Sequence, residues 1–257
     1  MAENTEVFSR ALAKYIEDRL GVSAESVTGI PWQERERMFD AGEIQILWIC
    51  ALPYIQKADA AAKSMELLAV PVPAGERYLA KPVYFSDVIV RRDSPYQNLF
   101  DLRGAAWAYN EARSHSGYNV VRAYLAEFGQ NQRFFGEAFE SGAHSASLEM
   151  VLRGMADGAA IDSTVLEWIL SRREKLAERI RVIDTFGPSP IPPWIISRRV
   201  PFELAEKLRR ALLDMERQEP GRATLESGRL TRFVQAQDSD YDPIRRMARK
   251  ADSVLLA

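Results

Sequence analysis

The sequence predicts an α/β fold, because strand-like and helix-like segments alternate along almost the whole chain. Short runs rich in β-branched and aromatic residues recur, and most are followed by a segment whose apolar residues repeat every three or four positions. Glycines and prolines stand at many of the boundaries. Since such alternation is typical of parallel sheets covered by helices, we expect mostly parallel sheets.

The elements are expected in the following order. The first helix has apolar positions from Val7 to Leu20 and stops at Gly21, and the second begins at Pro31 and ends before Gly42. Further helices are predicted after Pro53 and at 117–128, 145–155, 163–178, 201–217, 221–227 and 242–255. Strands are predicted at 44–49, 65–72, 84–91, 105–109, 134–139, 159–161, 181–185 and 194–197.

Composition excludes several classes of protein. The net charge is −2, and basic runs are interleaved with acids, which argues against a nucleic-acid partner. The single cysteine, Cys50, and the two histidines argue against a disulfide framework and a metal site, so no cofactor is expected. The longest apolar stretch, 44–55, is too short to cross a membrane. The first ten residues lack the basic start and apolar core of a signal peptide.

Two segments are expected to connect two lobes. One is the long strand at 84–91, and the other is the proline-rich stretch at 187–193. If the chain crosses at both, residues 1–89 and 188–257 together form a discontinuous first lobe, and residues 90–187 form an inserted second lobe. Ligands in folds of this kind bind outside the carboxyl ends of strands, where loops lead into helices.

A polar cluster stands at one of these junctions. Ser114, His115, Ser116 and Gly117 lie between a predicted strand and a predicted helix. Hydroxyls, a glycine and the free N–H groups of a helix start can bind an anion. The alternative is that Ser114 or Ser116 only caps the helix. The local sequence leaves both interpretations open.

Two further junctions carry polar residues. His144 precedes the next predicted helix, and Asp162 follows the short strand at 159–161. Each is compatible with a helix cap as well as with a ligand contact. In a parallel sheet all three junctions would point to the same edge, which favours a shared site. Tyr84, Tyr54 and Trp48, together with Trp194, could supply aromatic walls with hydrogen-bonding groups, although each could equally be a core residue.

Several stretches together resemble the phosphate/phosphite/phosphonate-binding proteins of ABC importers, a family of type II periplasmic binding proteins. The resemblance runs through WQERERMFDAGEIQILWICALPYI, PVYFSDVIVRRDSPYQNLFDLRG, SHSGYN, GAHSASLEMVLRGMADGAAIDSTVLE and PPWIISRRV. It implies a two-lobed Venus-flytrap fold with a two-strand hinge that closes on a small oxyanion. It also implies an ABC permease as partner and a periplasmic location.

The resemblance implies a set of ligand-binding residues. The serine- and threonine-rich turn of the family corresponds to Ser114-His115-Ser116-Gly117, with a histidine where many relatives have threonine. The family's histidine and aspartate correspond to His144 and Asp162, and its cleft tyrosine corresponds to Tyr84. Trp48 or Tyr54 corresponds to a first-lobe aromatic. The first strand and the export signal that are usual in the family are not recognisable here, so a cytoplasmic location stays open.

Two other functions are compatible with the same predicted fold. An enzyme on the same fold could use Ser114, His115 and Asp162 as a triad, but a serine and a histidine that are immediate neighbours are a poor starting geometry. No GxSxG motif is present, and we expect no catalytic residues. The other rival is a cytoplasmic sensor that binds the same kind of small acid. The main hypothesis is a binding protein for phosphonate, phosphite or phosphate.

Overall fold

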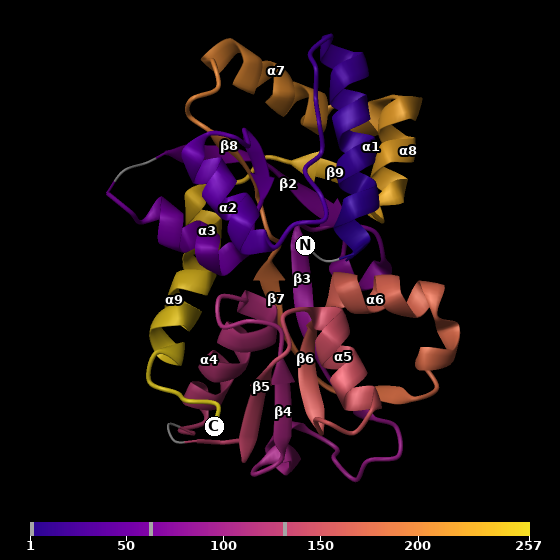
Figure 1. Cartoon of the computed structure of the whole chain (residues 1–257), viewed down its shortest axis with the longest axis vertical. Coiled ribbons are helices and arrows are strands. Elements are labelled where there is room, and N and C mark those ends of the chain that lie inside the picture. The colour runs from indigo at the N-terminus through magenta and orange to yellow at the C-terminus, as the bar shows by residue number, and fades with distance from the viewer. Residues whose placement is uncertain (1–2, 62–63, 131–132) are drawn as a thin grey trace. The chain divides into compact units, whose positions relative to one another are not determined.

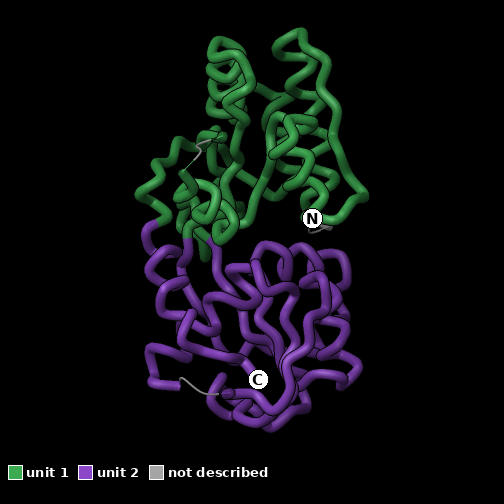
Figure 2. The backbone as a smooth tube through the Cα atoms, turned by 60° about the vertical axis from the view of Figure 1, so that its left-hand side comes forward, with its two compact units in different colours: residues 1, 3–83, 190–241 green, residues 2, 84–189, 242–257 purple. Residues whose placement is uncertain are grey.

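A computed structural model describes residues 3–61, 64–130 and 133–257 (Figure 1). The chain forms two compact units, coloured separately in Figure 2. Within the described residues, unit 1 consists of 3–83 and 190–241, and unit 2 consists of 84–189 and 242–257.

These units differ from the predicted lobes in two respects. The crossings lie after Val83 and after Ser189, a few residues from the predicted boundaries. The C-terminal helix α9 (Asp242–Ala251), which the prediction placed in the first lobe, belongs to unit 2.

Unit 1 is built on a four-stranded sheet with the order β1-β8-β2-β9. Its main core lies where α1, α7 and α8 pack against the sheet, around Phe8, Trp194 and Leu208. The strands are β1 (Ile46–Trp48), β2 (Met65–Pro73), β8 (Trp194–Ser197) and β9 (Leu230–Val234). The α-helices are α1 (Glu3–Leu20), α2 (Trp32–Ala41), α3 (Ala51–Ala58), α7 (Phe202–Leu213) and α8 (Glu219–Ser227).

Unit 2 is built on a five-stranded sheet with the order β5-β4-β6-β3-β7. Successive side chains of β3 point to opposite faces, as expected for a strand. Val88 and Val90 join the core with α4, whereas Ile89 joins the core with α5 and α6 (Figure 1). The sheet is therefore covered by helices on both faces. Its strands are β3 (Val83–Arg91), β4 (Ala106–Tyr109), β5 (Glu137–Glu140), β6 (Gly158–Asp162) and β7 (Ile180–Pro190). The α-helices besides α9 are α4 (Val120–Glu127), α5 (His144–Leu152) and α6 (Ser163–Arg172).

The α/β class is confirmed, but the sheets are not mostly parallel: the sheet of unit 2 is mixed, and neighbouring strands of the unit 1 sheet, β2 and β9 included, are antiparallel. β4 is parallel to β5 and β6, as predicted. By contrast, β3 runs antiparallel to β6, and β8 runs antiparallel to both β1 and β2. The reason is the chain path: β3 and β8 directly follow a passage from one unit to the other, and each enters its sheet from the opposite end.

Two strands depart from the prediction in extent. β9 lies in a stretch, LTRFV, that has only two buried residues, and the sequence analysis missed it although the turn signal Ser227-Gly228 stands before it. β7 continues to Pro190, through most of the stretch that was expected to be a proline-rich connection.

Candidate functional site

The three polar junctions of unit 2 lie at one edge of its sheet. β4, β5 and β6 are parallel neighbours, so their carboxyl ends point the same way. The residues that follow them lead into the π-helical turn before α4, into α5 and into α6, respectively. The expectation that these junctions come together is confirmed.

The SHSG junction forms a wide turn. His115–Asn119 is a single turn of π-helix, closed by a 3.0 Å hydrogen bond from the Asn119 N–H to the Ser114 carbonyl. Ser114 is buried, and its Oγ accepts the Gly117 N–H at 3.1 Å. Ser114 therefore caps the turn, as the alternative interpretation held. Its hydroxyl hydrogen is not used in that bond and can be donated to another group.

Gly117 is required by close packing. A Cβ at this position would lie 2.0 Å from Asn110 Oδ1 and 3.2 Å from His144 Cε1. No side chain larger than hydrogen fits without moving one of these neighbours. Asn110 and His144 therefore lie directly against the turn.

His115 is fully buried and held by two polar partners. Its Nδ1 lies 3.1 Å from Asn119 Nδ2, which can only donate, so Nδ1 accepts and the proton is on Nε2. Nε2 then donates to Ser189 Oγ at 3.1 Å. Burial lowers the pKa of His115 to about 3, so the ring is neutral at pH 7. Both ring nitrogens are thus engaged within the protein.

Ser116 joins two of the junctions. Its Oγ lies 3.1 Å from His144 Nε2, at the start of α5. Burial lowers the pKa of His144 to about 4, so this ring is also neutral at pH 7. His144 Nδ1 is buried and has no hydrogen-bond partner among the described residues. When Ser116 donates to Nε2, Nδ1 carries the proton and is a donor without an acceptor.

The N-terminus of α5 is the least satisfied of the three helix starts. The residue before it is Ala143, which provides no side-chain cap. The first N–H groups of a helix have no partner within the helix, and together with the helix dipole they favour an anion. Asp162 caps α6 and Ser114 caps the π turn, so α5 is the one start of the three without a side-chain acceptor.

Asp162 is half-buried and bonded through one oxygen. Its Oδ1 accepts the Thr164 N–H at 2.8 Å and the Thr164 hydroxyl at 2.7 Å. Burial raises the pKa of Asp162 to about 6 and Asp87 adds to this shift, while the bonds from Thr164 and Val165 oppose it. A carboxyl group that takes up a proton so near neutral pH can accept a hydrogen bond or donate one.

The predicted aromatic residues fall in different units. Tyr84 is buried in unit 2, with its ring centroid 6.4 Å from that of His115. Tyr54 and Trp48 belong to unit 1. Tyr54 donates to Asp238 at 2.7 Å, and Trp48 donates its ring N–H to the Pro192 carbonyl at 2.8 Å. Their role in ligand binding stays a prediction.

The sequence analysis missed three residues that shape this site. Ser86 donates to the Ser116 carbonyl, Ser189 accepts from His115, and Asn110 lies against Gly117. Asn110 could have been predicted from the sequence, because it directly follows a strand at the same edge of the sheet as the other junctions. Ser86 and Ser189 lie inside strands, where a single serine carries no distinguishing pattern.

Residues 3–61, 64–130 and 133–257 contain no group of three or more His, Cys, Asp or Glu side chains that could hold a metal ion. Within the same ranges, each helix is too short or too polar to cross a membrane.

The fold and the site together define a class of protein. Two α/β units formed by a chain that passes back and forth between them, with polar helix starts at one edge of a sheet, are typical of the two-lobed solute-binding proteins. A family model described as the periplasmic substrate-binding protein of the phosphonate ABC transporter matches residues 2–241. The chain belongs to this family.

Several solved structures share the fold. The binding-protein component of an ABC phosphonate transporter from Pseudomonas aeruginosa is 18% identical, with a TM-score of 0.85 over 98% of this chain and 84% of that chain. PhnD1 from Prochlorococcus marinus, solved in complex with methylphosphonate, is 18% identical, with a TM-score of 0.82 over 95% of this chain and 92% of that chain. A Xanthomonas citri protein solved with ATP is 16% identical, with a TM-score of 0.76 over 98% and 94%.

Proposed function

We propose that the three junctions of unit 2 bind the phosphonate, phosphite or phosphate group of a small solute that an ABC importer takes up. The uncapped N-terminus of α5, next to the Ser116–His144 contact, carries this proposal. The neutral donors there are the α5 N–H groups, the Ser114 hydroxyl and one further group of the Ser116–His144 pair. That group is His144 Nδ1 when Ser116 donates to Nε2, or the Ser116 hydroxyl when Nε2 donates to Ser116. They can neutralise an oxyanion without burying a positive charge.

Asp162 would select the protonation state of the ligand. A carboxylate repels a fully ionised oxyanion, whereas it accepts a hydrogen bond from one that still carries a proton. The raised pKa of Asp162 also allows the carboxyl itself to hold the shared proton. We therefore expect preference for monoprotonated oxyanions over sulfate, which carries no proton at neutral pH.

A permease partner, a periplasmic location and the absence of catalysis belong to the same proposal, and membership of the family supports them. The Venus-flytrap closure of such proteins would then follow ligand binding. Turnover of the bound solute, detected by mass spectrometry, would favour an enzyme instead.

Thermal unfolding with methylphosphonate, phosphite, phosphate and sulfate tests the proposal. A ligand at 100 times its Kd adds about 2.7 kcal/mol to the free energy of unfolding, which is a measurable rise in Tm. Ser116→Ala removes one hydrogen bond to a charged group and is expected to weaken binding by about 10- to 100-fold. Ser171→Ala, an exposed serine of α6, is the matched control and should leave binding unchanged. A well-folded protein that responds to none of the oxyanions would contradict the proposal.

A further inference from the structure

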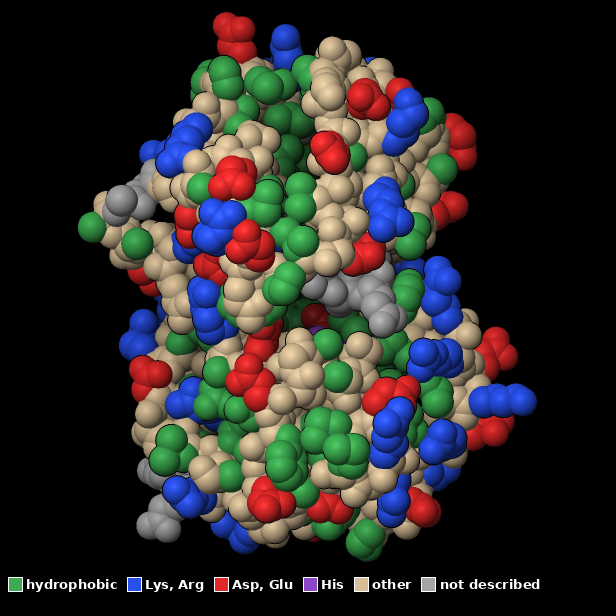
Figure 3. Space-filling model, in the orientation of Figure 1, with side chains coloured by type: hydrophobic (Ala, Val, Ile, Leu, Met, Phe, Trp, Pro, Cys, Tyr) green, Lys and Arg blue, Asp and Glu red, His purple; other side chains and the backbone are tan. Residues whose placement is uncertain are grey.

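The oxyanion site of unit 2 contains a further buried polar atom without a partner, besides His144 Nδ1. Asn110 is 7% exposed, and its Oδ1 is buried and has no hydrogen-bond partner among the described residues. Both atoms lie beneath the surface, and on the face drawn in Figure 3 histidine side chains are visible only as a small recessed area. A buried carbonyl oxygen without a donor is unfavourable, because on folding it loses its hydrogen bonds to water.

The backbone holds Asn110 beside the start of α5, which has no side-chain cap. Asn110 directly follows β4, and its carbonyl accepts the Gly142 N–H at 2.8 Å. The Ser141 N–H bonds to the Tyr109 carbonyl, also at 2.8 Å. These two bonds join the end of β4 to the loop that leads into α5. Asn110 therefore cannot move away from the start of α5 without breaking them.

The side chain of Asn110 points at the turn formed by residues 115–119. A Cβ added to Gly117 would lie 2.0 Å from Asn110 Oδ1 and 3.2 Å from His144 Cε1. Asn110 Oδ1 and the His144 ring therefore approach the same side of Gly117. Cε1 is the ring atom next to Nδ1, so the two buried atoms belong to side chains that lie close together.

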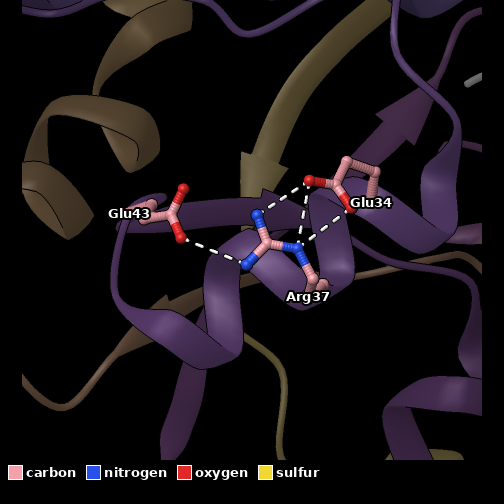
Figure 4. A network of polar contacts seen from close by, with 3 residues as sticks. All are labelled: Glu34, Arg37 and Glu43. Carbon is pink, nitrogen blue, oxygen red and sulfur yellow. Dashed lines mark hydrogen bonds and ion pairs between the residues drawn. The ribbon is translucent and has the colours of Figure 1, made fainter.

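Asn110 differs in this respect from the polar groups of the surface. Arg37 on α2, for example, binds Glu34 at 2.7 Å and Glu43 at 3.2 Å (Figure 4). These side chains are exposed, so bulk water would satisfy them if the ion pairs broke. The partner of Asn110 Oδ1 must instead be a group held inside the site, either an ordered water molecule or a ligand.

A hydrogen-bond acceptor is unfavourable beside an oxyanion unless the ligand brings a proton. The Asn110 side-chain carbonyl repels an anionic oxygen, whereas a hydroxyl group on phosphorus donates to it. When Ser116 donates to His144 Nε2, Nδ1 carries the proton and can donate in turn to the oxygen of that hydroxyl. One hydroxyl group, which donates one hydrogen bond and accepts another, would then satisfy both buried atoms.

We propose that Asn110 Oδ1 accepts a hydrogen bond from a P–OH group of the bound ligand. This inference rests on the oxyanion site proposed above, and it narrows the ligands to acids of phosphorus that keep a hydroxyl group. The monoanions of phosphate, phosphite and methylphosphonate meet this condition, whereas the anions of phosphinates and phosphate diesters have the same charge but no hydroxyl. Because the ligand hydroxyl is directed to Asn110, Asp162 keeps its own proton and donates it to an anionic oxygen.

Methylphosphonate and dimethylphosphinate are the matched ligands for the test. At pH 6 both are mainly monoanions, and dimethylphosphinate has a methyl group where methylphosphonate has its hydroxyl. Isothermal titration calorimetry of the full chain should show that methylphosphonate binds at least about tenfold more tightly, which is the scale of one hydrogen bond to a charged group. Equal binding of the two ligands would overturn the proposal, and it is expected if an ordered water molecule satisfies Asn110.

Variants show which residue contacts the hydroxyl. Asn110→Leu replaces the amide with an apolar group of nearly the same shape, and it should lose most of the preference for methylphosphonate, because neither ligand then meets the acceptor. Asn110→Asp keeps an acceptor and should keep the preference, although its negative charge weakens the binding of both anions. Asp162→Asn should also keep the preference, because its amide can donate to the anionic oxygen as the protonated carboxyl does.

The outcomes separate this inference from the proposed function. A preference that persists in Asn110→Leu but disappears in Asp162→Asn would show that Asp162 accepts from the hydroxyl. The inference would then be overturned, while the oxyanion site would stand. If the natural protein binds neither these two ligands nor phosphate or phosphite, the proposed function fails and the inference fails with it. Should Asn110→Leu not fold, Asn110→Ala removes the same acceptor and allows the same comparison.

Discussion

The two units differ in how far their buried polar groups have hydrogen-bond partners. At the edge of the unit 2 sheet, Ser116 bonds to His144, and His115 and Asp162 each bond to other residues of the unit, with donors left over at the start of α5. In unit 1, Arg35 is buried, and its Nη1 has no hydrogen-bond partner among the described residues. The donors left over in unit 2 agree with the oxyanion site proposed there, whereas the buried Arg35 of unit 1 is a cost to stability.

The largest effect is expected where the unit 2 site is packed most tightly. Gly117→Ala would place a Cβ 2.0 Å from Asn110 Oδ1, and overpacking of this kind costs about 1–3 kcal/mol. The Asn110 side chain or the π turn must move, so oxyanion binding should be lost together with stability. Urea unfolding and ligand-induced Tm shifts measure both.

The matched control for this change is the double variant Gly117→Ala/Asn110→Ala. It removes the amide that the new methyl group would meet, and it should recover much of the lost stability, although the 3.2 Å approach to His144 remains. A Gly117→Ala protein as stable as the natural one would show that the junction is loosely packed, and the contrast between the units would then weaken.

The second test uses the raised pKa of Asp162. Between pH 4 and 6 the folded protein keeps a proton on this carboxyl that the unfolded chain, with an Asp pKa of 3.8, has released. Asp162 therefore lowers the free energy of unfolding as pH rises through this window, by about 1.4 kcal/mol per pH unit. Asp162→Asn should gain stability over the natural protein at this rate from pH 4 to 6, and then level off.

The two histidines act in the opposite direction. Their pKa values, about 3 for His115 and about 4 for His144, lie below the usual 6.5, so the unfolded chain binds more protons and stability falls as pH drops below 6.5. The natural protein and Asp162→Asn both contain His115 and His144. The histidine contribution therefore cancels when the free energies of unfolding of the two proteins are subtracted. If the difference in free energy of unfolding between Asp162→Asn and the natural protein does not change between pH 4 and 6, Asp162 is solvated in the folded state.

The sequence predicts more of unit 2 than of unit 1 for a physical reason. Ser114, His144 and Asp162 are recognisable because each stands where a strand ends and a helix begins, and parallel strands bring such junctions to one edge. The polar roles of Ser86 and Ser189 depend on contacts between segments that are distant in sequence. No local pattern encodes them.

The burial of Arg35 in unit 1 could likewise not be predicted from the sequence. Arg35 lies in WQERERMF, where alternating charges predict a solvated helix face. That prediction holds for Arg37, which is exposed and paired, but Arg35 is buried. Which arginine faces inward depends on how α2 packs beside β1.

The smallest effect concerns this pair of arginines. Arg35→Met replaces a buried guanidinium, whose Nη1 has no hydrogen-bond partner among the described residues, with an apolar side chain of similar length, and it should raise the free energy of unfolding by about 1 kcal/mol. Arg37→Met removes only exposed ion pairs and should change it by less than about 0.5 kcal/mol. Urea unfolding of both variants at pH 7 measures the difference. If Arg35→Met destabilises the protein by more than 1 kcal/mol, the guanidinium is already satisfied within unit 1, and the contrast between the two units disappears.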